Sequence, residues 1–198
     1  IALFLFASGL ATAYFLIPQI LPHTVLLFLL MQAYNFGMKN IAYLDVLLIA
    51  ANFFVRAAAG AGIASVQPSQ WFVLGIFSAG LFLAVGKRLA DLKMLKERAR
   101  EHKKVYEKYT KEALGSLLNV SLVLVLAVYL LFVLESRAMD NGIAMLSIPF
   151  VFFVSFRYYT FASEEDARVV EPILFALDWQ MLAGVAAIAI ILGMAVYL

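Results

Sequence analysis

Three charged side chains stand in sequence that is otherwise apolar enough to lie in lipid: Lys39, Asp45 and Arg56. A charge at the centre of a bilayer costs about 2.5–3.5 kcal/mol on insertion scales, so its usual explanation is functional. Lysine and arginine neutralise phosphate oxygens, and a carboxylate can hold Mg²⁺ beside a diphosphate. These residue types therefore favour binding of a phosphorylated ligand at a membrane.

The spacing of Asp45, Asn52 and Arg56 places them on one face of a helix. At 100° per residue, Asn52 and Arg56 return to within about 20° of Asp45. Asp45 and Arg56 are separated by about 16 Å along the axis, so they cannot pair directly. An interfacial ion pair for Asp45 and an interhelical hydrogen bond for Asn52 are structural alternatives, whereas the depth of Arg56 favours a functional role.

The preceding apolar segment carries a second polar stripe, formed by Gln32, Asn35 and Lys39. We predict that this stripe faces the first one, with the Tyr34 hydroxyl beside it and Gly37 loosening the helix end. A snorkelling lysine and an interhelical hydrogen bond are the structural alternatives for Lys39 and Asn35. Together the two stripes predict one polar pocket.

A further pair of cations, Lys87 and Arg88, ends a later apolar run and opens a charged stretch that continues to residue 112. The pair fits either membrane anchoring or phosphate binding. Opposite charges at i,i+4 in the stretch suit a water-exposed helix, and Tyr106, Tyr109 and Ala113 form too sparse an apolar set to face a core. The stretch is therefore expected to be a solvated connection, or else a lid over a cavity with Lys87 and Arg88 at its fixed end.

Other polar positions carry a weaker signal. Arg157, Glu171 and Asp178 form a loose set that fits an ordinary loop. His23 and His102 fall in different connections, which argues against a histidine metal site or triad. No glycine-rich phosphate loop is present, and the basic stretch balances itself with acids, so no nucleic-acid partner is expected.

Composition identifies the setting as a lipid bilayer. The chain is 65 % apolar and 14 % charged, with a mean hydropathy of +0.94, far from the balance of a soluble domain. Each span needs about 20 apolar residues, which predicts an all-α polytopic bundle in one domain, 1–198, with the charged segment at 87–114. The expected spans are 1–17, 22–38, 44–61, 70–88, 115–134, 143–162 and 178–197.

The distribution of positive charge predicts the orientation. If the connections alternate between the two sides, one set holds 13 of the 15 Lys and Arg. The positive-inside rule places that set, with Lys39, Asp45 and Arg88, in the cytoplasm. The chain begins at Ile1 within an apolar run without a Met, which suggests a fragment. It contains no cysteine.

The order of several motifs resembles the UbiA superfamily of intramembrane prenyltransferases. Tyr34-x4-Lys39-x5-Asp45 is followed by a Phe-Val-Arg-Ala-Ala-Ala-Gly-Ala segment around Arg56, by Trp-Phe, and by Gly-Lys-Arg at Arg88. The similarity is strongest to the decaprenyl-phosphate phosphoribosyltransferase-like branch and covers nearly the whole chain. Met replaces the usual Leu before the lysine, and the arginine segment is a shortened match.

The resemblance implies nine transmembrane helices around a cavity open to the cytoplasm, with two acidic regions flanking a Mg²⁺-bound diphosphate. The first acidic motif is absent from this sequence, so the seven spans would be helices three to nine, and the chain alone is expected to be inactive. By resemblance Asp45 belongs to the second acidic region and binds the metal. The residues that the resemblance implies on phosphates are Tyr34, Lys39, Arg56, Lys87 and Arg88, of which Lys39 and Arg56 join Asp45 as catalytic. Asn35 and Asn52, from the two polar stripes, are expected to complete the binding site.

The activity that the resemblance implies is transfer of 5-phosphoribose from phosphoribosyl diphosphate to a polyprenyl phosphate, in lipid-linked sugar and cell-wall biosynthesis. One alternative is a related enzyme that uses a prenyl diphosphate donor with an aromatic or glycerol-phosphate acceptor. Another is a transporter whose buried charges line a permeation path. The transporter needs a polar path to both faces, whereas the outer connections are short and almost uncharged.

Overall fold

The computed structural model describes residues 2–95, 104–135, 142–164, 169 and 178–197, and within them every regular element is helical. Short 3-10 turns lie at Pro18–Ile20 (η1), Met38–Asn40 (η2), Lys104–Lys108 (η3) and Ile143–Ser147 (η5). The α-helices are α1 (Ala2–Leu16), α2 (Leu21–Phe36), α3 (Leu44–Ile63), α4 (Gln70–Leu95), α6 (Lys111–Glu135), α7 (Ile148–Ser163) and α10 (Trp179–Tyr197). All seven predicted helices are therefore confirmed as helices.

Local sequence explains where two of these helices end. α2 ends at Phe36 because Gly37 adopts φ +155°, which residues with a Cβ rarely adopt. α4 runs seven residues beyond the predicted end at 88, since no breaker follows and the charges there are compatible with a helix. Lys87 and Arg88 consequently lie within α4 and not at its end, which corrects the sequence-based boundary.

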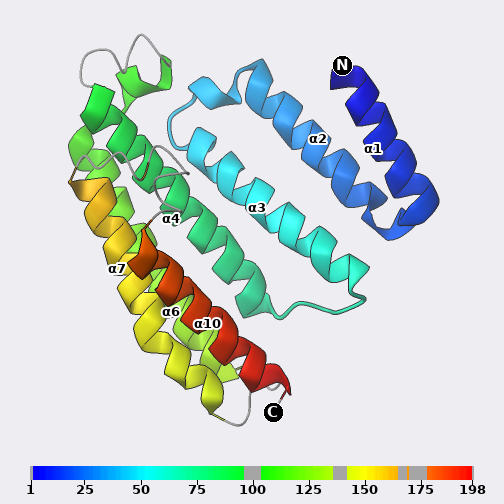
Figure 1. Cartoon of the computed structure of the whole chain (residues 1–198). Coiled ribbons are helices and arrows are strands. Elements are labelled where there is room, and N and C mark those ends of the chain that lie inside the picture. The colour runs from blue at the N-terminus through cyan, green and yellow to red at the C-terminus, as the bar shows by residue number, and fades with distance from the viewer. Residues whose placement is uncertain (1, 96–103, 136–141, 165–168, 170–177, 198) are drawn as a thin grey trace.

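The helix α4 is the centre of the arrangement (Figure 1). It packs against α3 on one side and α6 and α7 on the other; α10 packs on α7, and α2 and then α1 lie outside α3. Helices that follow one another in the chain run in opposite directions, so η2 and the C-terminal end of α4 come to the same end of the molecule. This topology brings the two sequence regions with candidate site residues together.

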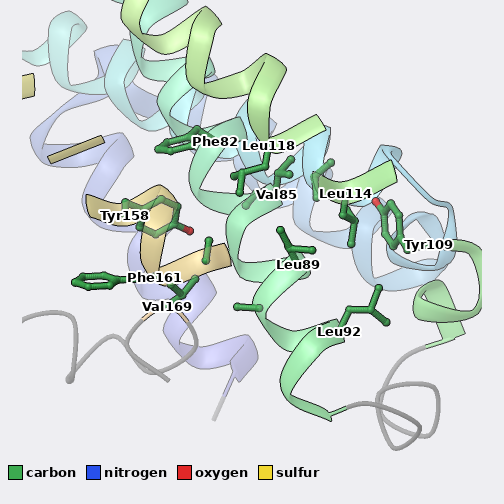
Figure 2. Packing of buried hydrophobic residues seen from close by; sticks show 14 of the residues in the cluster. Phe82, Val85, Leu89, Leu92, Tyr109, Leu114, Leu118, Tyr158, Phe161 and Val169 are labelled. Atoms are coloured by element: carbon green, nitrogen blue, oxygen red, sulfur yellow. The ribbon is translucent and has the colours of Figure 1, made fainter. Parts of the chain in front are cut away.

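The core forms where α4, α6 and α7 meet (Figure 2). Val85 and Leu89 of α4 point toward Leu114 and Leu118 of α6, and all four are almost completely buried. On the α7 side, a Cβ placed on Gly86 would come within 2.6 Å of the Tyr158 ring, and the Tyr158 hydroxyl donates to the Leu83 carbonyl at 2.7 Å. Glycine at 86 therefore allows α4 and α7 to approach closely.

Five helical stretches in the described part of the chain are long and apolar enough to cross a bilayer: Leu44–Ile63, Gln70–Met94, Lys111–Glu135, Ile143–Ser163 and Trp179–Tyr197. The chain is an all-α polytopic membrane protein. α1 and α2 have 15 and 16 residues, respectively, which is less than the roughly 20 that a span needs. That α1 and α2 also cross the membrane stays a prediction.

Candidate anion-binding site between α2, α3 and α4

A buried ion pair links α3 to α4. The Arg88 Nε donates to the Asp45 Oδ2 at 2.7 Å, and the two residues are 3 % and 0 % exposed. Burying two charges is costly unless hydrogen bonds satisfy their remaining polar atoms. The neighbouring side chains supply such bonds.

Two tyrosines of the segment between α4 and α6 complete the pair. The Tyr109 hydroxyl donates a short hydrogen bond to the second carboxylate oxygen of Asp45. The Tyr106 hydroxyl accepts from the Arg88 Nη1 at 3.4 Å and donates to the Asp91 Oδ2 at 2.6 Å. Arg88, Asp45, Asp91 and these two tyrosines thus form one hydrogen-bonded group, called the buried charge network below.

The burial of Tyr106 and Tyr109 corrects the prediction that they are too sparse to face a core. They are 2 % and 5 % exposed, and Val105 beside them is fully buried. Each ring supplies apolar area while its hydroxyl reaches a carboxylate, a combination that hydrophobic periodicity alone does not reveal. Burial, and then the hydrogen bonds to Asp91 and Asp45, raise the pKa of both tyrosines above the ordinary value of 10.0.

Backbone geometry at the start of α3 also serves this contact. Tyr43 has φ +67°, a left-handed value that is uncommon outside glycine. Its backbone N–H donates to the Tyr109 hydroxyl at 2.7 Å, and the two rings meet edge to face with centroids 5.3 Å apart. The strained residue thus holds the hydroxyl that in turn bonds Asp45.

A cavity of about 240 Å³ opens between α2 and α3 beside the network. Tyr34, Asn52 and Arg56 provide its polar lining, and Met31, Ile49 and Phe53 the apolar part. The Tyr34 hydroxyl also accepts from the Arg88 Nη2 at 3.2 Å, so it joins the cavity to the buried charge network. The exposed Arg56 therefore lines the cavity, and the buried Arg88 lies behind its wall at Tyr34.

Asn52 shows an unmet hydrogen-bonding capacity in this cavity. Its Nδ2 donates to the Leu48 carbonyl of its own helix at 2.8 Å, whereas its Oδ1 is buried and has no partner in the described structure. The bond within α3 differs from the interhelical bond considered as an alternative. A buried polar atom without a partner is uncommon, which marks this position as a candidate ligand contact.

Other predicted site residues lie outside the cavity. Asn35, Lys39 and Lys87 are exposed and do not belong to its lining, so their roles on phosphates stay predictions. Tyr34 of α2 lines the cavity, whereas the predicted stripe of Gln32, Asn35 and Lys39 does not. Glu171 and His102 lie outside the described residues.

The arrangement around Asp45 does not fit a magnesium site. Both carboxylate oxygens accept hydrogen bonds, and the donor at one of them is a guanidinium cation. Mg²⁺ usually keeps several waters, yet Asp45 has no exposed surface. Within the residues that the structure describes, no group of three or more His, Asp or Glu could hold a metal.

Arg157 and Asp178, two of the polar positions with a weaker signal in the sequence, form an ion pair between α7 and the start of α10. Arg157 bonds Asp178 through Nε at 2.9 Å and Nη2 at 2.6 Å, and the guanidinium lies 5.0 Å from the Phe161 ring centroid. Asp178 Oδ1 also accepts from the backbone N–H of Met181, which caps the start of α10. This pair fastens α10 to α7.

A larger cavity of about 370 Å³ lies among α4, α6, α7 and α10. Its walls are almost wholly apolar and run along α4 from Trp71 to Leu83, a length of about 18 Å at 1.5 Å per residue. Phe82, Leu83 and Tyr158 line the end nearer to Arg88. The shape and lining suit a hydrocarbon chain.

Comparison with known proteins finds relatives that share one name, although no protein-family model matches the chain. A decaprenyl-phosphate phosphoribosyltransferase of Mycobacterium tuberculosis is 28 % identical over 195 residues, which cover 94 % of this chain and 64 % of the relative. Proteins of the same name from Mycolicibacterium smegmatis and Corynebacterium glutamicum are 40 % identical over 78 residues and 32 % over 115. These matches cover 39 % and 57 % of this chain, and 24 % and 35 % of the relatives. The predicted similarity is confirmed: over nearly its whole length the chain is similar to proteins named decaprenyl-phosphate phosphoribosyltransferase.

Proposed function

We propose that the protein to which this chain belongs transfers 5-phosphoribose from phosphoribosyl diphosphate to a polyprenyl phosphate and releases diphosphate. The relatives are named decaprenyl-phosphate phosphoribosyltransferase, and the chain spans 64 % of the length of the Mycobacterium tuberculosis protein. The observation that carries the proposal is the cavity lined by Tyr34, Asn52 and Arg56 and backed by Arg88.

The charges at this cavity suit a phosphorylated donor. Arg56 lines the cavity, and the Tyr34 hydroxyl, which accepts a hydrogen bond from Arg88, keeps its own O–H as a donor for a phosphate oxygen there. Guanidinium groups bind phosphate oxygens through paired N–H donors. As negative charge builds on the leaving diphosphate, these donors lower the barrier most if they are already in place.

The lipid phosphate serves as the nucleophile in this proposal. One of its oxygens forms a bond to C1 of the ribose while the bond from C1 to the diphosphate oxygen breaks, and the electron pair leaves with the diphosphate. No serine or cysteine nucleophile is required. The requirement for Mg²⁺ implied by the resemblance stays a prediction, and no described residue is assigned to it.

The apolar cavity along α4 gives the acceptor lipid a place to hold part of its chain. It lies on the side of α4 that faces α6, α7 and α10, and its lining reaches Leu83, about one and a half turns along the helix from Arg88. Part of a long polyprenyl chain can lie there while its phosphate extends toward Arg88 and the polar cavity at Tyr34. The rest of the chain would remain in the surrounding bilayer.

The proposed site faces the cytoplasm. The turn η2, which contains Lys39, and the C-terminal end of α4 lie at the same end of the bundle (Figure 1). Most of the Lys and Arg among the described residues belong to elements at this end. The chain contains no cysteine, so single cysteines can be introduced at Lys39 and at Ser65, which lies beyond the opposite end of α3. A membrane-impermeant thiol reagent added outside intact cells should label Ser65→Cys and spare Lys39→Cys.

Donor competition tests the reaction. The full-length protein in liposomes should convert labelled phosphoribosyl diphosphate and a polyprenyl phosphate into a phosphoribosyl lipid. Consumption of a prenyl diphosphate with an aromatic or glycerol-phosphate acceptor would instead support the prenyltransferase alternative. Flux of substrate across the vesicle without a lipid product would support the transporter.

A further inference from the structure

We propose that Asp45 is a positioning residue for Arg88 and for the segment between α4 and α6, and not a ligand of the catalytic metal. The inference deepens the proposed function, because Arg88 is assigned there to the phosphorylated donor. It departs from the metal-binding role that the resemblance implies for Asp45. Three features of the geometry support it.

The first feature is the way Asp45 fixes the direction of the guanidinium. Its Oδ2 accepts from the Arg88 Nε at 2.7 Å, which leaves both terminal nitrogens for other partners. Nη1 points to Tyr106, and Nη2 points to Tyr34 at the cavity. Because the guanidinium is planar, fixing Nε fixes where the Nη groups point.

The second feature is the absence of room on the carboxylate for a hydrated cation. The other oxygen of Asp45 accepts from the Tyr109 hydroxyl, and the residue is 0 % exposed. Each oxygen keeps a second lone pair, but the residue has no exposed surface, so a hydrated divalent cation could reach either oxygen only if the surrounding side chains moved apart. At Oδ2 it would also lie beside a guanidinium of the same charge sign.

The third feature is the link from Asp45 to the connecting segment. Tyr109 lies 64 residues along the chain from Asp45, and its hydroxyl is held between that carboxylate and the Tyr43 N–H. Lys108, the residue before Tyr109 at the end of η3, donates to the Asn40 carbonyl at 3.2 Å. Removal of the Asp45 charge should therefore loosen both Arg88 and residues 104–110.

The test compares Asp45→Asn, Asp45→Glu and Tyr109→Phe with the wild-type full-length protein in nanodiscs. Three quantities are measured: Mn²⁺ affinity by electron paramagnetic resonance, amide hydrogen exchange of residues 104–110, and KM and kcat for phosphoribosyl diphosphate. We expect Asp45→Asn to change Mn²⁺ affinity less than twofold, to speed exchange about tenfold, and to raise KM about tenfold or more. Asp45→Glu should raise KM less than Asp45→Asn does. Tyr109→Phe should speed the exchange of residues 104–110 without altering Mn²⁺ affinity.

The opposite pattern overturns the proposal: loss of Mn²⁺ affinity by tenfold or more in Asp45→Asn, with exchange of residues 104–110 unchanged. If Asp45→Asn does not fold, Tyr109→Phe decides, because unchanged exchange in that variant contradicts the link. If the wild type forms no phosphoribosyl lipid, the proposed function fails. Mn²⁺ binding and exchange then still decide the role of Asp45.

Discussion

Arg88 of α4 is bound to Asp45 of α3 through a 2.7 Å contact between buried charged groups. These residues belong to two different motifs and lie 43 positions apart in the chain. Their pairing gives each buried charge a partner and places the guanidinium behind the cavity that Tyr34 and Arg56 line. The network is thus both a structural link between helices and the inner wall of the candidate site.

Removal of Arg88 should destabilise the protein strongly. Arg88→Met leaves the Asp45 carboxylate buried without its cation, a change that typically costs about 3–5 kcal/mol. Thermal unfolding in detergent should show a large fall in Tm, and Arg88→Met with Asp45→Leu should recover much of it. Lys87→Ala, at the exposed neighbouring position, is the control and should change the free energy of unfolding by less than about 0.5 kcal/mol. Equal Tm values for Arg88→Met and Lys87→Ala would contradict the importance of the buried pair.

Loss of the cavity arginine should affect the reaction more than the fold. Arg56 is exposed at the cavity, so Arg56→Ala removes a charge-assisted contact with little loss of packing. We expect kcat/KM for phosphoribosyl diphosphate to fall about tenfold to a hundredfold or more, with Arg56→Lys intermediate because it keeps the charge. Lys111→Ala, an exposed cation outside the cavity lining, should retain wild-type kinetics. Wild-type kinetics for Arg56→Ala would remove this residue from the site.

A methyl group at position 86 should separate α4 from α7. Gly86→Ala places a Cβ 2.6 Å from the buried Tyr158 ring, and such overpacking costs about 1–3 kcal/mol. Gly115→Ala in α6 is a matched control, because its Cβ has no neighbour within 4 Å and alanine is the better helix former. The Tm should fall for the first variant and stay level or rise for the second. A fall of equal size in both would contradict the proposed close approach.

High pH should weaken the connection between α4 and α6. Tyr106 and Tyr109 have folded-state pKa values above the ordinary value of 10.0, so the folded state holds these protons more tightly than the unfolded state. Their contribution to stability is complete below about pH 10 and declines as the pH rises above it. The Tm of the wild type should fall between pH 10 and 11 more steeply than that of Tyr106→Phe with Tyr109→Phe. Parallel curves would show that neither hydroxyl is coupled to folding.

Partial filling of the apolar cavity should impair use of long-chain acceptors. Ala79 lines this cavity on α4, and Ala79→Phe would occupy space proposed for the lipid chain. Val123 of α6 is 66 % exposed, so Val123→Phe adds similar bulk away from the cavity. Turnover with a long polyprenyl phosphate should fall in the first variant and not in the second, while a short-chain analogue is used equally by both. Equal use of the long lipid by both variants would place its chain elsewhere.

Hydrophobic run length was enough to predict all seven helices, because segments that pack in lipid must be continuously apolar. Helix ends were less certain, as α4 shows: its charged last turns stay helical because they pack against the connecting segment. Helical spacing also predicted that Asn52 and Arg56 share a face, and both line one cavity.

The pairing of Asp45 with Arg88, and the roles of Tyr106 and Tyr109, could not be predicted from spacing. They depend on how α4 packs against α3 and on where the connection to α6 folds back, and both are tertiary properties. One available signal was that Tyr106 and Tyr109 are the aromatic residues in a stretch of charges. A second signal was the spacing of Arg88 and Asp91, because opposite charges three residues apart on a helix are close enough to interact.

Transfer of labelled phosphoribose into lipid tests the central claim most directly. The full-length protein, reconstituted in liposomes that contain polyprenyl phosphate, is incubated with phosphoribosyl diphosphate labelled in the ribose, and the label extracted into organic solvent is measured. The wild type should form a labelled lipid, and Arg56→Ala should form less by about tenfold or more. Absence of labelled lipid from the wild type with several chain lengths would contradict the proposed function.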